Sequence, residues 1–173
     1  VVETVEFGER LPFTGNVNDT ALGNLIHSFL AYDLLSPGVE DRTEVARRLI
    51  GNHGLDGNLT APSLTAFADR FSAEIRQRFN PKQTLVEVPF HYQTDTGQSI
   101  TGFIDLLLKT DSGWFLIDHK SFPGKKKDWD EKALSYSGQL NCYRKALIPH
   151  GIQLRGTWIH FAVGGSLLLV ATP

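Results

Sequence analysis

The sequence predicts an α/β fold in which a mixed central sheet is flanked by helices. In the first half of the chain, apolar residues recur at helical spacing, whereas most of the second half consists of short β-rich runs. One further helical segment separates the third of these runs from the last two. An order of helices, three strands, a helix and two strands is typical of a sheet covered by helices.

Three helices are expected in residues 1–80, near 20–35, 42–50 and 63–79. Asn18-Asp19-Thr20 can cap the first helix, which is expected to end near Ser36-Pro37-Gly38. The segment from Asp41 to Glu44 resembles a capping box for the second. Ser63 is expected to begin the third, and Asn80-Pro81 stops it.

Strand periodicity takes over after residue 80. Strands are expected at 84–93, 100–109, 114–121, 154–163 and 166–171, with a helix from about Asp130 to Ile148. A hairpin turn of two residues, Asp111-Ser112, is expected to join the second strand to the third. In that register Asp105 lies directly across from Asp118, whereas a longer turn would move Asp105 by one residue.

The composition is that of an ordinary globular chain. Its 173 residues are 41% hydrophobic and 21% charged, with a formal net charge of −2, so one domain is expected and a wholesale basic nucleic-acid binder is disfavoured. Cys142 is the only cysteine, so this chain alone supplies neither an intrachain disulfide nor a four-cysteine zinc or iron–sulfur site. The sequence contains no phosphate-loop or serine-elbow motif, which argues against a motor or an esterase.

Location and boundaries are also read from the sequence. No apolar run approaches the ~20 residues that span a bilayer, and the first residues lack the pattern of a signal peptide. A cytoplasmic protein without membrane contact is therefore expected. The chain begins at Val1 and contains no methionine, which predicts a fragment of a longer protein.

Three charged residues, Asp105, Asp118 and Lys120, lie inside two strongly apolar runs. Like charges placed directly opposite one another destabilise a sheet, so either one carboxyl group is protonated or a cation lies between the two. Strand alternation points Lys120 to the same face as Asp118. Two carboxylates and an amine suit a hard divalent cation and a lysine that orients or deprotonates water. The simpler interpretation is a structural salt bridge that tethers the hairpin.

Four motifs in order add to this constellation. They are Gly23-Asn24-Leu25-Ile26-His27, G-F-I-D ending at Asp105, L-I-D-H-K-S around Asp118, and Tyr136-x-x-Gln139-Leu140-x-x-Tyr143. Together, from about residue 22 to 145, they resemble the PD-(D/E)XK nuclease superfamily, and within it the RecB/AddA-like nuclease domains of helicase-nucleases. The resemblance implies a restriction-endonuclease-like core and a single nuclease domain over 1–173, with a helical part (1–80) and a sheet-containing catalytic core (81–173).

Carried over residue by residue, the resemblance implies that Asp105, Asp118 and Lys120 are catalytic. Asp105, Asp118, His27 and the backbone carbonyl of His119 would bind Mg²⁺ or Mn²⁺. Ile104 replaces the proline of the superfamily's name, and His119 stands where tyrosine is usual before the lysine. Relatives with an iron–sulfur cluster need cysteines that this chain lacks.

The downstream motif and a basic loop are the expected substrate contacts. Gln139 and Tyr143 match residues that line the active site and contact DNA in the family, and Glu87 and Tyr136 are possible further site residues. In the loop after the catalytic strand, Lys125 and Lys126 would offer phosphates an electrostatic foothold, and Trp129 could stack on a base. Each of these residues also has a simpler interpretation. His27 would be a histidine of the core, and the helix with Gln139 and Tyr143 would only pack its aromatic side on the sheet. Glu87 would be exposed on its strand, and the loop with the lysines would be solvated.

The expected function is that of a Mg²⁺-dependent deoxyribonuclease. The resemblance implies the exonuclease module of a RecB/AddA-like DNA repair and recombination helicase, acting on DNA, with single-stranded ends as the expected substrate. The helicase domain would lie on the same chain or in the same complex. Two alternatives are a free-standing phage-type exonuclease and a non-catalytic DNA-binding or scaffolding relative with the same fold.

Overall fold

The computed structural model describes residues 1–35, 38 and 41–171 of the chain. One sheet runs through it, with strands in the order β1-β6-β5-β4-β3-β2. The strands are β1 (Glu3–Glu6), β2 (Gln83–Gln93), β3 (Ser99–Thr110), β4 (Gly113–Lys120), β5 (Leu154–Phe161) and β6 (Ser166–Val170). β4 and β5 pair in parallel, and the other neighbours pair antiparallel. The predicted α/β class with a mixed central sheet is therefore confirmed.

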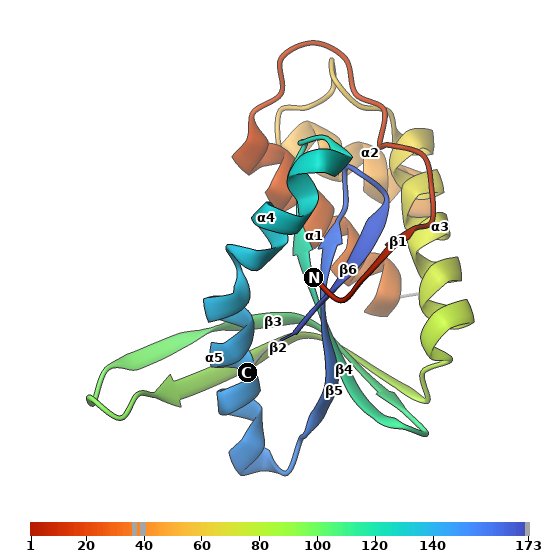
Figure 1. Ribbon diagram of the computed structural model, residues 1–173. Helices are drawn as coiled ribbons and strands as arrows, with labels where there is room; N and C mark the ends of the chain where they lie inside the picture. The colour runs from red at the N-terminus through yellow and green to blue at the C-terminus, as the bar shows by residue number, and fades with distance from the viewer. Residues whose placement is uncertain (36–37, 39–40, 172–173) are drawn as a thin grey trace.

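Helices cover both faces of this sheet (Figure 1). The helices are α1 (Asp19–Leu35), α2 (Arg42–Asn52), α3 (Ala61–Phe79), α4 (Trp129–Leu134) and α5 (Ser137–Leu147), with short 3-10 turns η1 (Lys126–Asp128) and η2 (Ile148–His150). α1, α2 and α3 pack on one face around Ile117 and Trp158, and α4 and α5 pack on the other around Leu116 and Ile159. No helix in the described part of the chain is long and apolar enough to cross a membrane.

The caps of the first three helices follow local signals in the sequence. The side chain of Asn18 accepts from Ala21 N at 2.9 Å, and that of Asp41 accepts from the first backbone N–H groups of α2. α3 begins at Ala61, two residues before the expected start at Ser63, because Thr60 is the N-cap and Pro62 fits the first turn. The expected end of the first helix includes Ser36 and Pro37, which lie outside the described residues.

Two elements differ from expectation. The expected helix from Asp130 to Ile148 is two helices, α4 and α5, separated at Ser135 and Tyr136. Ser135 donates its hydroxyl to Lys132 O at 2.7 Å, and serine and glycine around the break are weak helix formers. β1 was not expected, because its four residues carry little local signal and pair with the edge of β6 through the backbone.

Candidate active site

The predicted hairpin register is confirmed, and it ends where the charged residues begin. Thr110 pairs with Gly113 across the two-residue turn, and the β3–β4 ladder continues to Leu106 and Ile117. Asp105 and Asp118 are the next residues on each strand, one step beyond the last ladder pair. β4 continues to pair with β5 as far as Lys120. The ladder between β3 and β4 therefore ends just before Asp105 and Asp118. The gap between the two strands at these carboxylates is called the opening.

The neighbouring β2–β3 ladder is interrupted at the same row. Val86 pairs with Leu106 and Val88 with Ile104, and Glu87 and Asp105 lie between these pairs. Glu87 has a left-handed backbone with φ of 50°, which is unfavourable for a residue with a Cβ atom and is found mostly at functional sites. Residues two apart on a strand normally share a face of the sheet. Val86 packs on the α1–α3 side, whereas Val88 packs on the α4–α5 side, so the alternation of side chains is broken at Glu87.

His27 joins α1 to this opening. The buried residues around it, including Ile26 and Phe29, anchor α1 on the sheet. His27 Nδ1 lies 3.3 Å from Asp105 Oδ1, and His27 Nε2 lies 3.1 Å from the backbone oxygen of His119. Asp105 Oδ2 accepts the His119 N–H at 2.6 Å. The carboxylate of Asp105 thus accepts from a backbone N–H that would otherwise donate to a neighbouring strand.

A metal ion fits the donor set of this opening. Ligand atoms of His27, Glu87 and Asp105 all lie within 4.8 Å of one another. Adjacent ligands of an octahedral Mg²⁺ with bonds of about 2.1 Å are about 3 Å apart, close to the 3.1 Å between His27 Nε2 and His119 O. The carboxylate and carbonyl oxygens are donors of the kind that Mg²⁺ and Mn²⁺ accept, whereas the imidazole nitrogen is a ligand more typical of transition metals.

Asp118 lies at the same opening but faces Lys120. Its side chain is 1% exposed, and its Oδ2 lies 2.5 Å from Lys120 Nζ. Neither carboxylate oxygen accepts a hydrogen bond of normal geometry from the described residues. A buried carboxylate with so few partners is costly, and a cation would satisfy it. In the present geometry Asp118 stands beside the His27–Glu87–Asp105 group rather than within it.

The electrostatics differ among the acids. Burial raises the pKa of Asp118 to about 6, although Lys120 opposes the shift. Burial also favours the protonated form of Asp105, but His27 and His119 outweigh it and lower the pKa of Asp105. Burial and the charge of Asp105 raise the pKa of Glu87. The burial of Asp118 thus favours the first of the two alternatives from the sequence, a carboxyl group with a raised pKa.

The pKa of the His27 imidazole shifts in the direction that favours its charged form. Burial alone would lower the pKa of His27, but its hydrogen bond to Asp105 and the charge of that carboxylate outweigh the burial and raise it. A charged imidazole can donate from both nitrogens, which matches its contacts with Asp105 and the His119 carbonyl. A protonated imidazole at His27 would place its positive charge between these two acceptors.

Residues from α5 and the helix break complete the opening. Lys120 Nζ lies 4.9 Å from the ring centroid of Tyr136, and this approach is possible because Tyr136 sits at the break between α4 and α5. Gln139 Nε2 donates to the hydroxyl of Tyr143 at 2.5 Å. Burial, then the charges of Asp118 and Asp105, raise the pKa of Tyr143. The hydroxyl of Tyr143 therefore stays protonated as a donor beside the carboxylates.

The basic loop after β4 is more ordered than the flexible phosphate-binding loop that was expected. Lys126 forms an ion pair with Glu6 of β1, and the loop contains the 3-10 turn η1, while Lys125 is exposed. The expectation that Trp129 stacks on a base is wrong. Its side chain is 5% exposed, packs against Phe161 and donates to Gly124 O at 3.3 Å.

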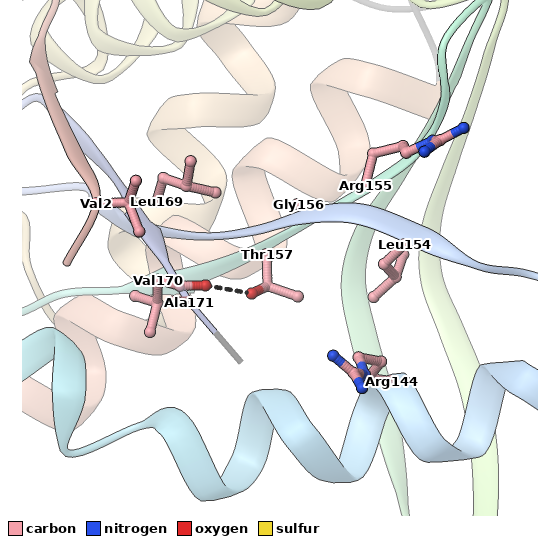
Figure 2. Close-up of a pocket in the computed structure, with 9 residues that line it drawn as sticks. All are labelled: Val2, Arg144, Leu154, Arg155, Gly156, Thr157, Leu169, Val170 and Ala171. Carbon is pink, nitrogen blue, oxygen red and sulfur yellow. Dashed lines mark hydrogen bonds between the residues drawn. The ribbon is translucent and has the colours of Figure 1, made fainter. Parts of the chain in front are cut away.

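One residue at the opening was not expected from the sequence. His53, just after α2, lines a cavity of about 570 Å³ together with His27 and Glu87. The sequence gives no signal for this, because His53 follows a different helix from His27 and has no neighbour at ligand spacing. A further pocket of about 260 Å³, lined mainly by β5 and β6 with Arg144 of α5, contains none of the carboxylates (Figure 2).

Comparison with known proteins gives one finding. A family model described as the PD-(D/E)XK nuclease superfamily matches residues 5–168. The matched segment includes the whole opening, from His27 on α1 to Tyr143 on α5. No curated protein matches the chain significantly.

Proposed function

The chain belongs to the PD-(D/E)XK nuclease superfamily, and we propose that it is a divalent-metal-dependent deoxyribonuclease that hydrolyses phosphodiester bonds. The observation that carries the proposal is the opening between β3 and β4. There Asp105, Glu87 and His27 can share one cation, and the buried Asp118 faces Lys120. A salt bridge that only tethers the hairpin would not need the additional acid and imidazole.

Four groups would hold the ion: Asp105, Asp118, His27 and the carbonyl of His119, with Glu87 as a further donor. When bound, Mg²⁺ or Mn²⁺ supplies an activated water and stabilises the charge that develops on the phosphate. The aspartates come from adjacent strands of the packed sheet, which fixes their separation. Asp105 also holds the His119 backbone N–H, so one residue orients two of the donors.

Lys120 is proposed as the catalytic lysine that positions the attacking water. Its ammonium lies between Asp118 and the face of Tyr136, so its position is set from both sides. Gln139 and the protonated Tyr143 are proposed to donate hydrogen bonds to the substrate phosphate. Lys125 is a proposed outer phosphate contact, whereas the ion pair of Lys126 with Glu6 would have to open before Lys126 could contribute.

The biological setting is proposed more narrowly. We infer that the chain is the exonuclease module of a RecB/AddA-like helicase-nuclease, active on single-stranded DNA ends in cytoplasmic repair and recombination. The support is the order of the four motifs along the chain. A free-standing exonuclease and a non-catalytic relative are the other outcomes that the experiments below distinguish.

The direct test is cleavage of labelled single-stranded DNA with Mg²⁺ or Mn²⁺ present. Wild type is expected to cleave, and Asp118→Ala and Lys120→Ala are expected to be inactive. Asp111→Ala and Lys82→Ala serve as matched controls, because these two residues form an exposed ion pair at the hairpin turn. Absence of cleavage, together with calorimetric metal binding that is also absent, would leave a DNA-binding or scaffolding module.

A further inference from the structure

A groove leads from the proposed active site along α5. Figure 1 shows β2 and β3 extending as a long arm past this helix. A cavity of about 400 Å³ between arm and helix is lined by Phe90, Gly102, Gln139 and Tyr143, among others. The next cavity, about 280 Å³, is lined by Tyr92 and Lys145. Gly138 and Cys142, one turn apart on α5, line both cavities, so the cavities adjoin along the helix; together they are called the arm groove.

We propose that the arm groove binds the unpaired nucleotides next to the scissile phosphate, so that the active site accepts a single strand. This inference rests on the proposed nuclease function and locates the path of its single-stranded substrate. The groove begins at Gln139 and Tyr143, the two residues of α5 beside the carboxylates. A strand with one phosphate at the metal site would therefore meet these two adjoining cavities on its way outward.

The groove offers aromatic side chains along one face of β2. The ring of Phe90 lies over Gly102, its cross-strand partner, so closely that a Cβ atom at Gly102 would lie 2.9 Å from Phe90 Cε1. The ring also meets Tyr143 edge to face, with centroids 5.1 Å apart and an interplanar angle of 82°. Tyr92, two residues further, points to the same face of the arm. Half-buried rings of this kind are platforms for base stacking.

The outer end of the groove carries one candidate phosphate contact. Lys145 is exposed at the outer end, where it can contact a phosphate. Asp95 also lines that end and limits the attraction, so the stacking surfaces rather than net charge would provide most of the affinity. The inner end is the proposed metal site.

A duplex does not suit this path. The rings of Phe90 and Tyr92 line cavities between a helix and the arm, where only unpaired bases can present their faces to them. In a duplex these faces are stacked on neighbouring base pairs, and exposing one costs a few kcal/mol. The groove is therefore expected to select single strands without selecting sequence, because every base has a π-face.

Cys142 provides a direct reporter of occupancy. It is the only cysteine of the chain and lines both cavities. The full chain would be alkylated with a fluorescent iodoacetamide in Ca²⁺, with and without an oligothymidylate, and with a duplex of equal length. The single strand is expected to slow alkylation of Cys142 about tenfold, and the duplex to leave the rate within about twofold.

Substitutions in the arm groove test whether oligothymidylate binds there. Phe90→Ala and Gly102→Ala, the second of which displaces the Phe90 ring, are each expected to weaken oligothymidylate binding about tenfold, the effect of one lost stack. Phe103→Ala is the matched control, because Phe103 is 57% exposed on the other face of the arm. Lys145→Ala is expected to reduce the slope of log affinity against log salt by about 1, and Lys82→Ala to leave it unchanged.

The outcomes separate this inference from the nuclease proposal. Cleavage of single strands with no protection of Cys142 and wild-type binding by Phe90→Ala would overturn the groove and leave the nuclease. Protection of Cys142 without cleavage would support the groove and overturn the nuclease. Equal protection by duplex and single strand would overturn the selectivity, and protection by an acidic peptide but not by DNA would overturn the inference altogether.

Discussion

The middle of the β3–β4 hairpin and its open end are both buried, yet they differ in chemistry. In the middle, the ladder is complete and apolar, with Leu107 and Leu116 fully buried. At the open end, Asp105 and Asp118 are 7% and 1% exposed, and the backbone N–H of His119 is taken by a carboxylate. Burial therefore does not separate core from candidate site. Where the backbone ladder stops, polar side chains take over its hydrogen bonds and become available to a ligand.

The largest effect is expected at the open end. Asp105→Asn is expected to reduce the single-turnover cleavage rate by a factor of about 10³, because a charged metal donor is lost while the amide oxygen can still accept from His119. Circular dichroism is expected to show an unchanged fold. The control Asp111→Asn, at the turn, is expected to cleave like wild type. A rate within tenfold of wild type would remove Asp105 from the proposed metal site.

The apolar middle of the hairpin is expected to respond in stability instead. Leu107→Ala removes a fully buried side chain from the core under α4 and α5 and is expected to lower the free energy of unfolding by about 2–5 kcal/mol. Urea titration would measure this loss. Cleavage per folded molecule is expected to stay near that of wild type. A selective loss of cleavage with unchanged stability would contradict the division between the middle of the hairpin and its open end.

Acid is expected to destabilise the protein through the histidines behind the open end. His160 is fully buried, stacks on Phe71 with ring centroids 4.3 Å apart, and shares a 2.9 Å Nδ1–Nδ1 hydrogen bond with His119. Burial lowers the pKa of His119 to about 4 and that of His160 well below its usual value. The unfolded chain therefore binds more protons below pH 6.5, so stability is expected to fall as the pH drops from about 6.5 towards 4.

His160→Asn tests this expectation, because asparagine does not titrate and can still pair with His119. Each buried neutral histidine contributes a slope of up to about 1.4 kcal/mol per pH unit, and the variant is expected to lose the share of His160. The raised pKa of Asp118 acts in the opposite direction as the pH falls from about 6 to 3.8, so the difference between variant and wild type is the quantity to measure. A pH-independent difference would contradict the assignment.

The smallest effect is expected at Glu87, where the backbone itself is strained. Glu87→Gly and Glu87→Ala both remove the carboxylate, but only glycine adopts a φ of 50° without cost. Relative to the alanine variant, the glycine variant is expected to be more stable by about 1 kcal/mol. Both variants are expected to lose metal affinity equally in calorimetry. Equal stability of the two would show that the strain is negligible.

Local signals in the sequence predicted a large part of the fold. The caps at Asn18 and Asp41, the turn at Asp111-Ser112 and the apolar runs of the hairpin specify their own structure within a few residues. The turn also fixed the register that leads to Asp105 and Asp118. Elements without a local signal were not predicted: the short edge strand β1, which exists through pairing with β6, and the break at Ser135, which a continuous helical pattern conceals.

By itself, the sequence determined the fold class, the hairpin register and the identity of the charged residues in the apolar runs, because these depend on periodicity, turn chemistry and spacing along the chain. Only the tertiary structure decided which groups meet. It brought His27 and His53 from separate helices to Glu87, paired Lys126 with Glu6, buried Trp129 and formed the arm groove against α5. The physical reason is that such contacts depend on how elements far apart in the chain pack, and no short-range pattern carries that information.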